Sequence, residues 1–275
     1  MPESESEFVQ HTPCEACGSS DAKAVYTDGH SYCFSCMDYS KESETDVASN
    51  ISADPSDTSL IQGSFAALAK RGITEKTCRK FGYQIGTYKG SPVHIAPFHD
   101  SKGTLCAQHI RFPNKDFSWI GSAKQATLFG QQLWRDSGKM VVITEGEIDC
   151  MSISQLQDNR WPVVSIRSGA WGAKKDIAKA VDWLNGFESV VLAFDMDDPG
   201  RKASSECAVL LAPGKAKVWN LPLKDANEML VAGRTKELLD AVWGAKVYRP
   251  DGIVSGLETW DLLMAEEPNS TVDYP

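Results

Sequence analysis

Four cysteines lie close together near the start of the chain, in two pairs with two residues between the members of each pair. Cys14 and Cys17 form the first pair, Cys33 and Cys36 form the second, and fifteen residues separate the pairs. Each pair can place two thiolates on one side of a metal ion, so that the two pairs complete a tetrahedron. Four sulfur ligands leave no open coordination position. The spacing therefore predicts one structural Zn²⁺.

The segment between the pairs could contact unpaired bases. Asp28 and Gly29 form a dipeptide typical of a hairpin turn. A small ribbon there would expose the Asp28 carboxylate and the rings of His30, Tyr32 and Phe34, which could stack on bases. In the alternative interpretation the aromatic residues pack the core of the ribbon, and we expect this of at least one of them. His30 could also be a zinc ligand, but the four cysteines already fill such a site.

Acidic residues follow two short apolar runs of the kind that form buried strands. Glu145 comes directly after the run 140–144, and Asp195 and Asp197 follow the run 190–194. The carboxyl ends of parallel strands meet at one edge of a sheet, so we expect the three carboxylates to lie close together. Their hard oxygens suit one or two catalytic Mg²⁺ ions, which Mn²⁺ could replace. In phosphoryl transfer, Mg²⁺ clamps the attacking and the leaving oxygen.

The alternative for acids after strands is that they cap the helices that follow. Capping suits Asp198, which precedes Pro199, a residue favoured in a first helical turn. It suits the other three carboxylates poorly, because like charges crowded at one edge repel each other unless a cation is present. Asp225 follows a fourth apolar run, 217–221. Its role is left open between a further metal ligand and a helix cap.

Strand and helix signals alternate between about residues 139 and 242. Near-continuous apolar strands separated by helices indicate a parallel sheet covered on both faces, and hence an α/β fold. Strands are predicted at 140–143, 163–166, 190–194 and 217–221, and helices at 147–157, at 173–184, from about 199, and after 221.

Composition divides the rest of the chain. Residues 41–60 are acidic and serine-rich with almost no large apolar side chain. Such a segment cannot bury a core and is predicted to be a flexible linker. The C-terminal tail has one amphipathic piece from Leu257 to Met264. A short docking helix and an exposed tail are both left open for it.

The net charge of −9 argues against a protein that coats nucleic acid through bulk electrostatics. In contrast to the chain as a whole, the segment 100–139 carries more basic than acidic residues. No run of eighteen apolar residues is present, and the acidic N-terminus lacks the apolar core of a secretory signal, so we expect a soluble, cytoplasmic protein without membrane contact. The basic residues of 100–139 are Lys102, Arg111, Lys115, Lys124, Arg135 and Lys139, against Asp100, Asp116 and Asp136.

The two acidic motifs resemble the Toprim fold shared by primases, topoisomerases and some nucleases. The order of zinc ribbon, linker and Toprim domain is similar to that of bacterial-type primases. The chain resembles most closely the primase half of the primase-helicases of T7-like podophages. The segments that carry this resemblance are Pro13–Asp21, Asp28–His30, Arg71–Ile73, Thr144–Asp149, Phe194–Asp197 and Lys224–Glu228.

The resemblance implies five parts: a zinc-binding, template-recognising domain at 8–40, the linker at 41–60, a basic N-terminal subdomain of an RNA polymerase domain at 61–137, a Toprim catalytic subdomain at 138–245, and a tail at 246–275 toward a helicase domain. That helicase domain is not expected here. Its nucleotide-binding P-loop needs a Gly-Lys pair followed by Ser or Thr, and neither Gly-Lys pair of this chain, at Gly138 and at Gly214, is followed by one. A fragment, a separate primase and half of a split protein are all left open.

The implied activity is the synthesis of short RNA primers from ribonucleoside triphosphates on single-stranded DNA, during phage replication in the host cytoplasm. A replicative helicase and a DNA polymerase are the implied partners. Glu145, Asp195 and Asp197 would hold Mg²⁺, with Asp149 and Asp225 supporting the same catalytic centre. Asp28 and His30 match positions linked to template recognition. The positions that would face nucleotide or DNA are His109, Arg111, Lys115, Lys124 and Arg201.

Two departures from the family pattern stand out. His109 occupies a position where a lysine is common, which could weaken a phosphate contact. The loop 167–175 carries Arg167 and a large Trp171 where the family favours small residues, so the role of this loop in holding nucleotide or template is open.

Three other kinds of protein are alternatives to a primase. A recombination mediator that pairs a four-cysteine zinc module with a Toprim domain is the main alternative, but it places the two modules close together. Here about a hundred residues lie between Cys36 and Met140. A topoisomerase needs a nucleophilic tyrosine on a much larger clamp. A Toprim nuclease stays a minor alternative.

Overall fold

The computed structural model describes residues 8–13, 23–27, 30–33, 39–41, 59–114, 116–250 and 256–265. The chain divides into two units, residues 1–56 and 57–275. The predictions made for Cys14, Cys17, Cys36, Asp28 and Lys115 fall outside the described residues, as do most of the predicted linker and the end of the tail.

The first unit holds an antiparallel sheet in the order β1-β2-β3-β4. β2 and β3 pair on either side of the predicted Asp28-Gly29 turn, as a hairpin requires. The Cys33 side chain is buried, and the His30 ring stacks on Tyr26 with 4.2 Å between ring centroids. One ring of the ribbon is therefore in a packing contact. The strands are β1 (Phe8–Thr12), β2 (Lys23–Tyr26), β3 (His30–Cys33) and β4 (Tyr39–Lys41).

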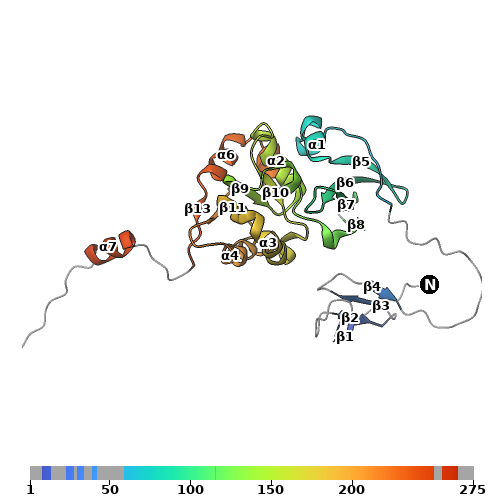
Figure 1. Ribbon diagram of the computed structural model, residues 1–275, viewed down its shortest axis with the longest axis horizontal. Coiled ribbons are helices and arrows are strands. Elements are labelled where there is room, and N and C mark those ends of the chain that lie inside the picture. The colour runs from blue at the N-terminus through green and yellow to red at the C-terminus, as the bar shows by residue number, and fades with distance from the viewer. Residues whose placement is uncertain are drawn as a thin grey trace, which may run out of the picture. The chain divides into compact units, whose positions relative to one another are not determined.

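The second unit begins with a helical turn, a short helix and an antiparallel meander in the order β5-β6-β7-β8 (Figure 1). Alternate residues of β6 face opposite sides, so Val93 and Ile95 pack with Ile110, whereas Phe98 faces the main core. The elements are η1 (Ala69–Arg71), α1 (Glu75–Phe81), β5 (Gln84–Tyr88), β6 (Ser91–His99), β7 (Leu105–Arg111) and β8 (Phe117–Gly121).

A five-stranded sheet follows, in the order β10-β9-β11-β12-β13. The first four strands are parallel, and β13 pairs antiparallel at one edge. The elements are η2 (Ala123–Gln125), η3 (Gln131–Leu133), β9 (Gly138–Thr144), α2 (Glu147–Leu156), β10 (Val163–Ser165), α3 (Gly169–Asn185), β11 (Phe187–Ala193), α4 (Asp198–Ala208), β12 (Ala216–Val218), α5 (Ala226–Val231), α6 (Thr235–Trp243) and β13 (Lys246–Val247).

Helices cover both faces of this sheet, which confirms the expected α/β class. Val141 and Ile143 of β9 pack in one core with residues of α3 and α4. Val142, between them, faces the other core, to which α2, α5 and α6 contribute. Figure 1 shows α3 and α4 on one side of the strands and α2 and α6 on the other. The apolar run 140–143 is continuous because its residues fill two cores.

Two sequence predictions need correction. The cap of α4 is Asp197, whose Oδ1 accepts a hydrogen bond from the Gly200 amide at 3.0 Å, and Asp198 lies in the first helical turn instead. The fourth strand is shorter than predicted and ends at Val218. The next residue, Trp219, is buried with its Nε1 donating to the Phe194 carbonyl, so the chain has already left the sheet there.

The amphipathic piece of the tail lies within a helix, α7 (Gly256–Ala265). In the part of the chain that the structure describes, no helix is long and apolar enough to cross a membrane.

Candidate active site

The acidic residues leave the central sheet at one edge. In the parallel ladder, Thr144 of β9 lies opposite Ala193 of β11. Glu145 follows the first of these residues directly, and Asp195 follows the second after one further residue. The register therefore brings both carboxylates to the carboxyl ends of neighbouring strands, where α/β sheets bind their ligands.

Glu145 is held by the start of α3. Its Oε1 accepts a hydrogen bond from the Ala170 amide at 3.1 Å, and Gly169 adopts a φ of 60° to present that amide. Its Oε2 is buried without a hydrogen-bond partner among the described residues. Burial raises the pKa of Glu145, and the nearby charge of Asp197 adds to the rise. A buried carboxylate oxygen without a donor is a position that a cation can satisfy.

Lys224 lies between the two aspartates that follow β11. Its Nζ is 3.3 Å from Asp195 Oδ2 and 3.2 Å from Asp197 Oδ2. Burial and the neighbouring Glu145 raise the pKa of Asp195 to about 6. Burial also acts on Asp197, but the Gly200 amide and Lys224 outweigh it and hold the pKa of Asp197 below its usual value. One ammonium group thus offsets part of the negative charge at the position where the sequence predicts a metal cation.

The donor set at this edge fits a divalent metal ion in chemical type. Three hard carboxylates follow the strands at this edge, and within the described part of the chain Glu145 Oε2 has no hydrogen bond of ordinary geometry. Across the described residues, no three His, Cys, Asp or Glu side chains already converge as a metal shell. Lys224 takes part of the space instead, and half of its side chain is exposed to solvent.

Asp149 lies in the first turn of α2, and Asp225 directly precedes α5. Asp149 Oδ1 accepts from the Asn227 amide at 2.9 Å, and burial followed by the charge of Asp225 raises the pKa of Asp149. Asp225 caps α5, because its Oδ1 accepts from the Glu228 amide at 2.7 Å. Of the two roles left open for Asp225, capping is confirmed. The Asp149 hydrogen bond therefore ties α2 to α5, whereas the Asp225 hydrogen bond lies within the first turn of α5.

His109 pairs with Glu147 at the start of α2. Its Nδ1 lies 2.6 Å from Glu147 Oε1, and both side chains are nearly buried. The imidazole stacks on Phe117 and on Trp119, with ring centroids 4.9 and 4.6 Å away. Burial favours the neutral form of Glu147, but the charge and hydrogen bond of His109 outweigh it, so the pKa of Glu147 is lowered. The residue that replaces a common lysine therefore connects the antiparallel sheet to α2.

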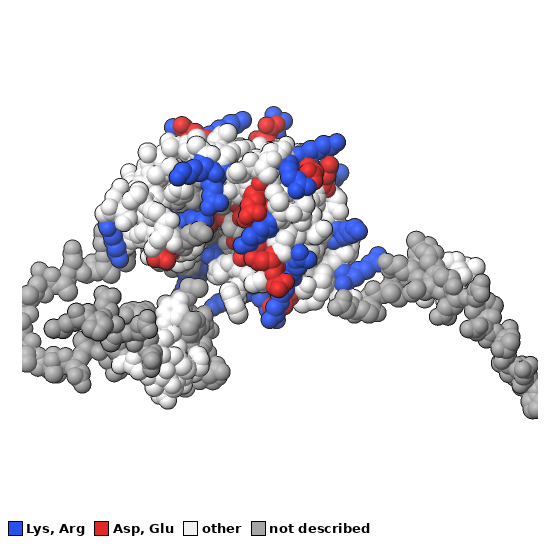
Figure 2. All heavy atoms as spheres, turned by 180° about the vertical axis from the view of Figure 1, so that it is seen from behind, with Lys and Arg blue, Asp and Glu red and all other residues white. Residues whose placement is uncertain are grey.

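The other predicted basic residues are spread around the unit. Arg111 lies over the Phe117 ring, 5.4 Å from its centroid. Lys124 belongs to η2, and Arg201 Nε donates to the Met196 carbonyl at 2.8 Å, next to the acidic edge. On the face drawn in Figure 2, lysine and arginine side chains lie among acidic ones and form no single basic patch.

The segment 167–175, predicted to be a loop, is helical from Gly169 onward, where α3 begins, and Arg167 and Trp171 have different surroundings in it. Arg167 is 12% exposed and forms a close ion pair with Asp176, which is 1% exposed, while its Nη1 donates to the Ala123 carbonyl at 2.7 Å. Trp171 is 96% exposed, one residue after the amide that contacts Glu145. Arg167 therefore fixes the start of α3, and Trp171 in its first turn is presented to solvent near Glu145.

Sequence reasoning did not assign a role to Lys224, to Asp176 or to Trp171. Lys224 directly precedes Asp225 in the sequence. Its contacts with Asp195 and Asp197 after β11 depend on how β12 and the following loop are placed, which the sequence does not reveal. Asp176 lies in the middle of a helix, where an acid ordinarily faces solvent, and no sequence signal marks it as buried.

The parallel sheet with acids at the ends of β9 and β11 is an arrangement of the Toprim class, and the family model described as "Toprim-like" matches residues 142–230. A second model, described as "Bacteriophage T7 DNA helicase/primase, N-terminal a+b fold", matches residues 63–121. The chain belongs to the primase family of the T7-type bacteriophage helicase/primases.

Three relatives illustrate this membership. The DNA helicase/primase of Enterobacteria phage T3 is 40% identical over 270 residues, which are 94% of this chain and 48% of the relative. The chain thus spans about half the length of that protein. The crystal structure of the primase fragment of the bacteriophage T7 primase-helicase superposes with a TM-score of 0.65 at 38% identity, covering 86% of this chain and all of the fragment.

The third relative is a structure of the bacteriophage T7 lagging-strand DNA polymerase interacting with primase domains bound to an RNA/DNA hybrid and dTTP. It matches with a TM-score of 0.65 at 42% identity, covering 68% of this chain and 94% of the primase chain.

Proposed function

We propose that this protein is a DNA primase, which synthesises short RNA primers on single-stranded DNA for phage replication. The observation that carries the proposal is that Glu145, Asp195 and Asp197 follow β9 and β11 at one carboxyl edge of the sheet, as the pairing of Thr144 with Ala193 requires. Family membership supports it, since the relatives are helicase/primases. Such an enzyme would work in the host cytoplasm.

Primer synthesis joins the 3′-oxygen of one ribonucleotide to the α-phosphorus of the next, and pyrophosphate leaves. Mg²⁺ at the acidic edge would make the 3′-hydroxyl a better nucleophile and stabilise negative charge on the departing phosphates. Glu145, Asp195 and Asp197 are the residues that would hold it. Lys224 would move away from the aspartates when the metal binds, and its ammonium group would then be available to the nucleotide phosphates.

The surrounding residues have supporting roles in this proposal. His109 acts through Glu147, because their contact ties β7 to the first turn of α2, directly after Glu145. Asp149 holds α2 against α5 on the other side, and Asp225 caps α5. Arg111, Lys115, Lys124 and Arg201 would contact nucleotide or template at single points, in agreement with the mixed surface charge. The exposed indole of Trp171 would stack on a template base.

For the first unit we propose a zinc site made by Cys14, Cys17, Cys33 and Cys36, with Asp28 and His30 contacting the template. The buried Cys33 at the end of β3 supports it, since a zinc ligand must lie inside the fold. The domain boundaries given above are part of this proposal. A replicative helicase and a DNA polymerase are the proposed partners, by analogy with the helicase/primase of phage T3 and with the polymerase-bound primase domains of phage T7.

The proposal is tested by incubating the protein with labelled ribonucleoside triphosphates, Mg²⁺ and a library of single-stranded DNA templates. We expect short RNA products, and sequencing the templates that were used would identify the recognised signal. DNA binding without any RNA product would favour a binding protein such as a recombination mediator, and cleavage of the library would favour a nuclease.

A further inference from the structure

A cavity of about 670 Å³ lies at the opposite edge of the parallel sheet from the carboxylates. It is bordered by the first residues of β9, by the α2–β10 loop and by the end of α6, and Gly138 and Lys139 line it. Glu145 follows the last residue of β9, so about 20 Å of extended strand separates the cavity from the acidic edge. Its volume lies in the range of pockets for single small ligands.

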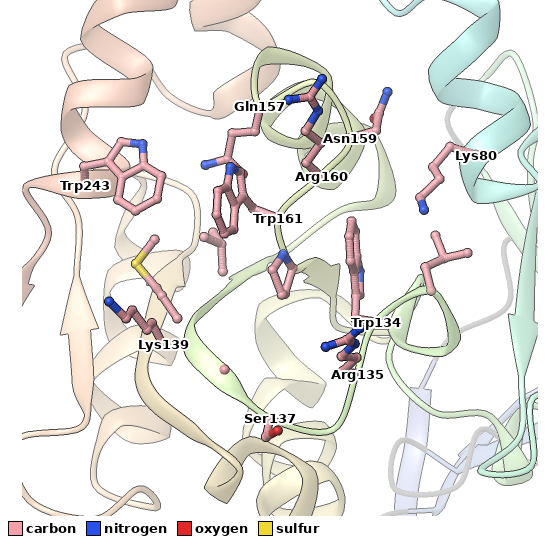
Figure 3. Close-up of a pocket in the computed structure, with 15 residues that line it drawn as sticks. Lys80, Trp134, Arg135, Ser137, Lys139, Gln157, Asn159, Arg160, Trp161 and Trp243 are labelled. Atoms are coloured by element: carbon pink, nitrogen blue, oxygen red, sulfur yellow. The ribbon is translucent and has the colours of Figure 1, made fainter.

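The lining of this cavity combines indole rings with positive charges. Three tryptophans line it, Trp134, Trp161 and Trp243, and the latter two are each 55% exposed. Figure 3 shows these rings bordering the same space. The ionisable residues of the lining are Lys80, Arg135, Lys139 and Arg160, all of them cations.

These cations are not neutralised from within the fold. Among the residues that the structure describes, no carboxylate forms a salt bridge with any of the four. Lys80 Nζ lies 5.0 Å from the centre of the Trp134 ring, so it contributes positive charge directly beside an aromatic face. The Trp134 ring is itself fixed, since its Nε1 donates to the Val163 carbonyl at 3.0 Å. On a chain of net charge −9, this is a local site for an anion.

The cavity also contains a buried polar side chain, that of Gln157. The residue is 8% exposed and lines the cavity, yet neither its Oε1 nor its Nε2 has a hydrogen-bond partner within the described part of the chain. A buried amide with both groups unsatisfied is unfavourable unless a ligand or water completes its hydrogen bonds. One acceptor and one donor side by side can pair with the donor–acceptor edge of an adenine base.

The loop that carries this amide is held rigidly. Asp158 and Asn159 both adopt positive φ angles, 55° and 57°. Asn159 Nδ2 donates to Thr77 Oγ1, and its Oδ1 accepts from Ser154 Oγ, both at 3.1 Å. The turn therefore holds the backbone of Gln157 and Trp161 at the cavity, and the buried Gln157 amide would turn toward a bound ligand.

We propose that this cavity is a second nucleotide site, distinct from the catalytic edge, which binds a free adenine nucleotide. The base would stack on the indoles of Trp134 and Trp161 and pair with the Gln157 amide, and the phosphates would lie among Lys80, Lys139 and Arg160. This inference does not depend on primer synthesis, because none of these residues belongs to the acidic edge.

The test is equilibrium dialysis of the full chain with radiolabelled ADP in Mg²⁺-free buffer. We expect one ADP bound per chain. Trp161→Ala and Gln157→Met should each weaken binding by about tenfold or more, as expected when a stacking platform or a base-pairing amide is removed. Asp195→Asn at the catalytic edge and Lys236→Glu, a charge reversal on an exposed lysine of α6 outside the cavity, should bind ADP like the wild type.

Gln157→Met also separates a ligand-binding role from a structural one. The substitution removes an amide that has no protein partner, so the free energy of unfolding should stay equal or rise while ADP binding falls. Absence of ADP binding by the wild type would overturn the proposal. So would loss in Asp195→Asn with retention in both cavity variants, which would place the bound ADP at the catalytic edge. Binding of an oligo(dA) strand or of an acidic aromatic peptide at this cavity, in place of ADP, would also contradict it.

Discussion

The ammonium group of Lys224 lies 3.3 Å from the Asp195 carboxylate, and the same nitrogen reaches Asp197 at 3.2 Å. One positive charge therefore faces two carboxylates, with Glu145 adding a third that raises the pKa of Asp195. The edge carries more negative than positive charge. We propose that Lys224 offsets part of this negative charge in the metal-free protein, and that its ammonium group moves away from the carboxylates when Mg²⁺ binds.

Replacing Lys224 by methionine should make the protein depend more on Mg²⁺ for stability. Without the ammonium group the aspartates repel each other, although the loss is limited to about 1 kcal/mol because the lysine is half exposed. The melting temperature should fall by about 2–4 °C in Mg²⁺-free buffer and recover on addition of Mg²⁺. Thermal unfolding with and without Mg²⁺ measures this, with Lys236→Met as the control. If Mg²⁺ changed the melting temperature of both variants and of the wild type by the same amount, Mg²⁺ would not be taking the position of the Lys224 ammonium group.

Replacing His109 by phenylalanine should destabilise the protein by about 3 kcal/mol, because it leaves the nearly buried Glu147 carboxylate without its partner. The aromatic ring itself should still stack between Phe117 and Trp119. Adding Glu147→Gln should restore more than half of the loss, since a neutral amide tolerates burial better than a charge. Urea unfolding of the two single variants and the double variant measures the coupling. Additive effects would show that the two side chains do not stabilise each other.

The Arg167–Asp176 ion pair and Trp171 should respond differently to substitution. Asp176→Asn breaks a buried ion pair and should cost about 3 kcal/mol, and it should lower primer synthesis because the Ala170 amide loses its fixed position at Glu145. Trp171→Ala should change stability by less than about 0.5 kcal/mol, since the indole is almost fully exposed, but it should weaken template binding. Urea unfolding and fluorescence anisotropy with single-stranded DNA check both. If the two variants lost the same stability and the same affinity for DNA, the structural role of Asp176 and the template-binding role of Trp171 could not be distinguished in this way, which would contradict the assignment.

Deletion of residues 1–56 should leave a folded catalytic unit. The cut falls between the two units and before Ile61, whose backbone amide and carbonyl pair with the Gln108 side chain at the start of the second unit. We expect weak, Mg²⁺-dependent joining of ribonucleotides by this fragment, without preference for a template signal. Product analysis on the template library makes the comparison with the full chain. Unchanged template selectivity would show that the first unit does not read the template.

The acidic edge could be predicted from the sequence because it depends on local patterns. Apolar runs mark β9 and β11, and parallel pairing brings whatever follows them to the same side. The zinc pattern is equally local, although three of its four cysteines lie outside the described residues. Capping was harder to predict, since Asp197 and Asp198 are both suitable caps and only the backbone path decides between them.

Features that join distant segments could not be predicted. The contact between His109 and Glu147 connects the antiparallel sheet to α2, and the Arg167–Asp176 pair is buried by the packing of α3 against η2. The cavity around Gln157 is assembled from α1, the start of β9, the α2–β10 loop and α6. Its members carry no shared motif in the sequence. Such sites depend on tertiary packing, which periodicity and spacing do not encode.

The most direct test of the central claim is primer synthesis by Asp195→Asn, compared with the wild type and with Lys236→Glu under the same Mg²⁺ and template conditions. The substitution keeps the side-chain volume and removes one charge, so the fold should be retained, as circular dichroism and urea unfolding would show. We predict that Asp195→Asn makes no detectable primer while the control variant matches the wild type. Primer synthesis by Asp195→Asn at the wild-type rate would contradict the assignment of this edge as the catalytic centre.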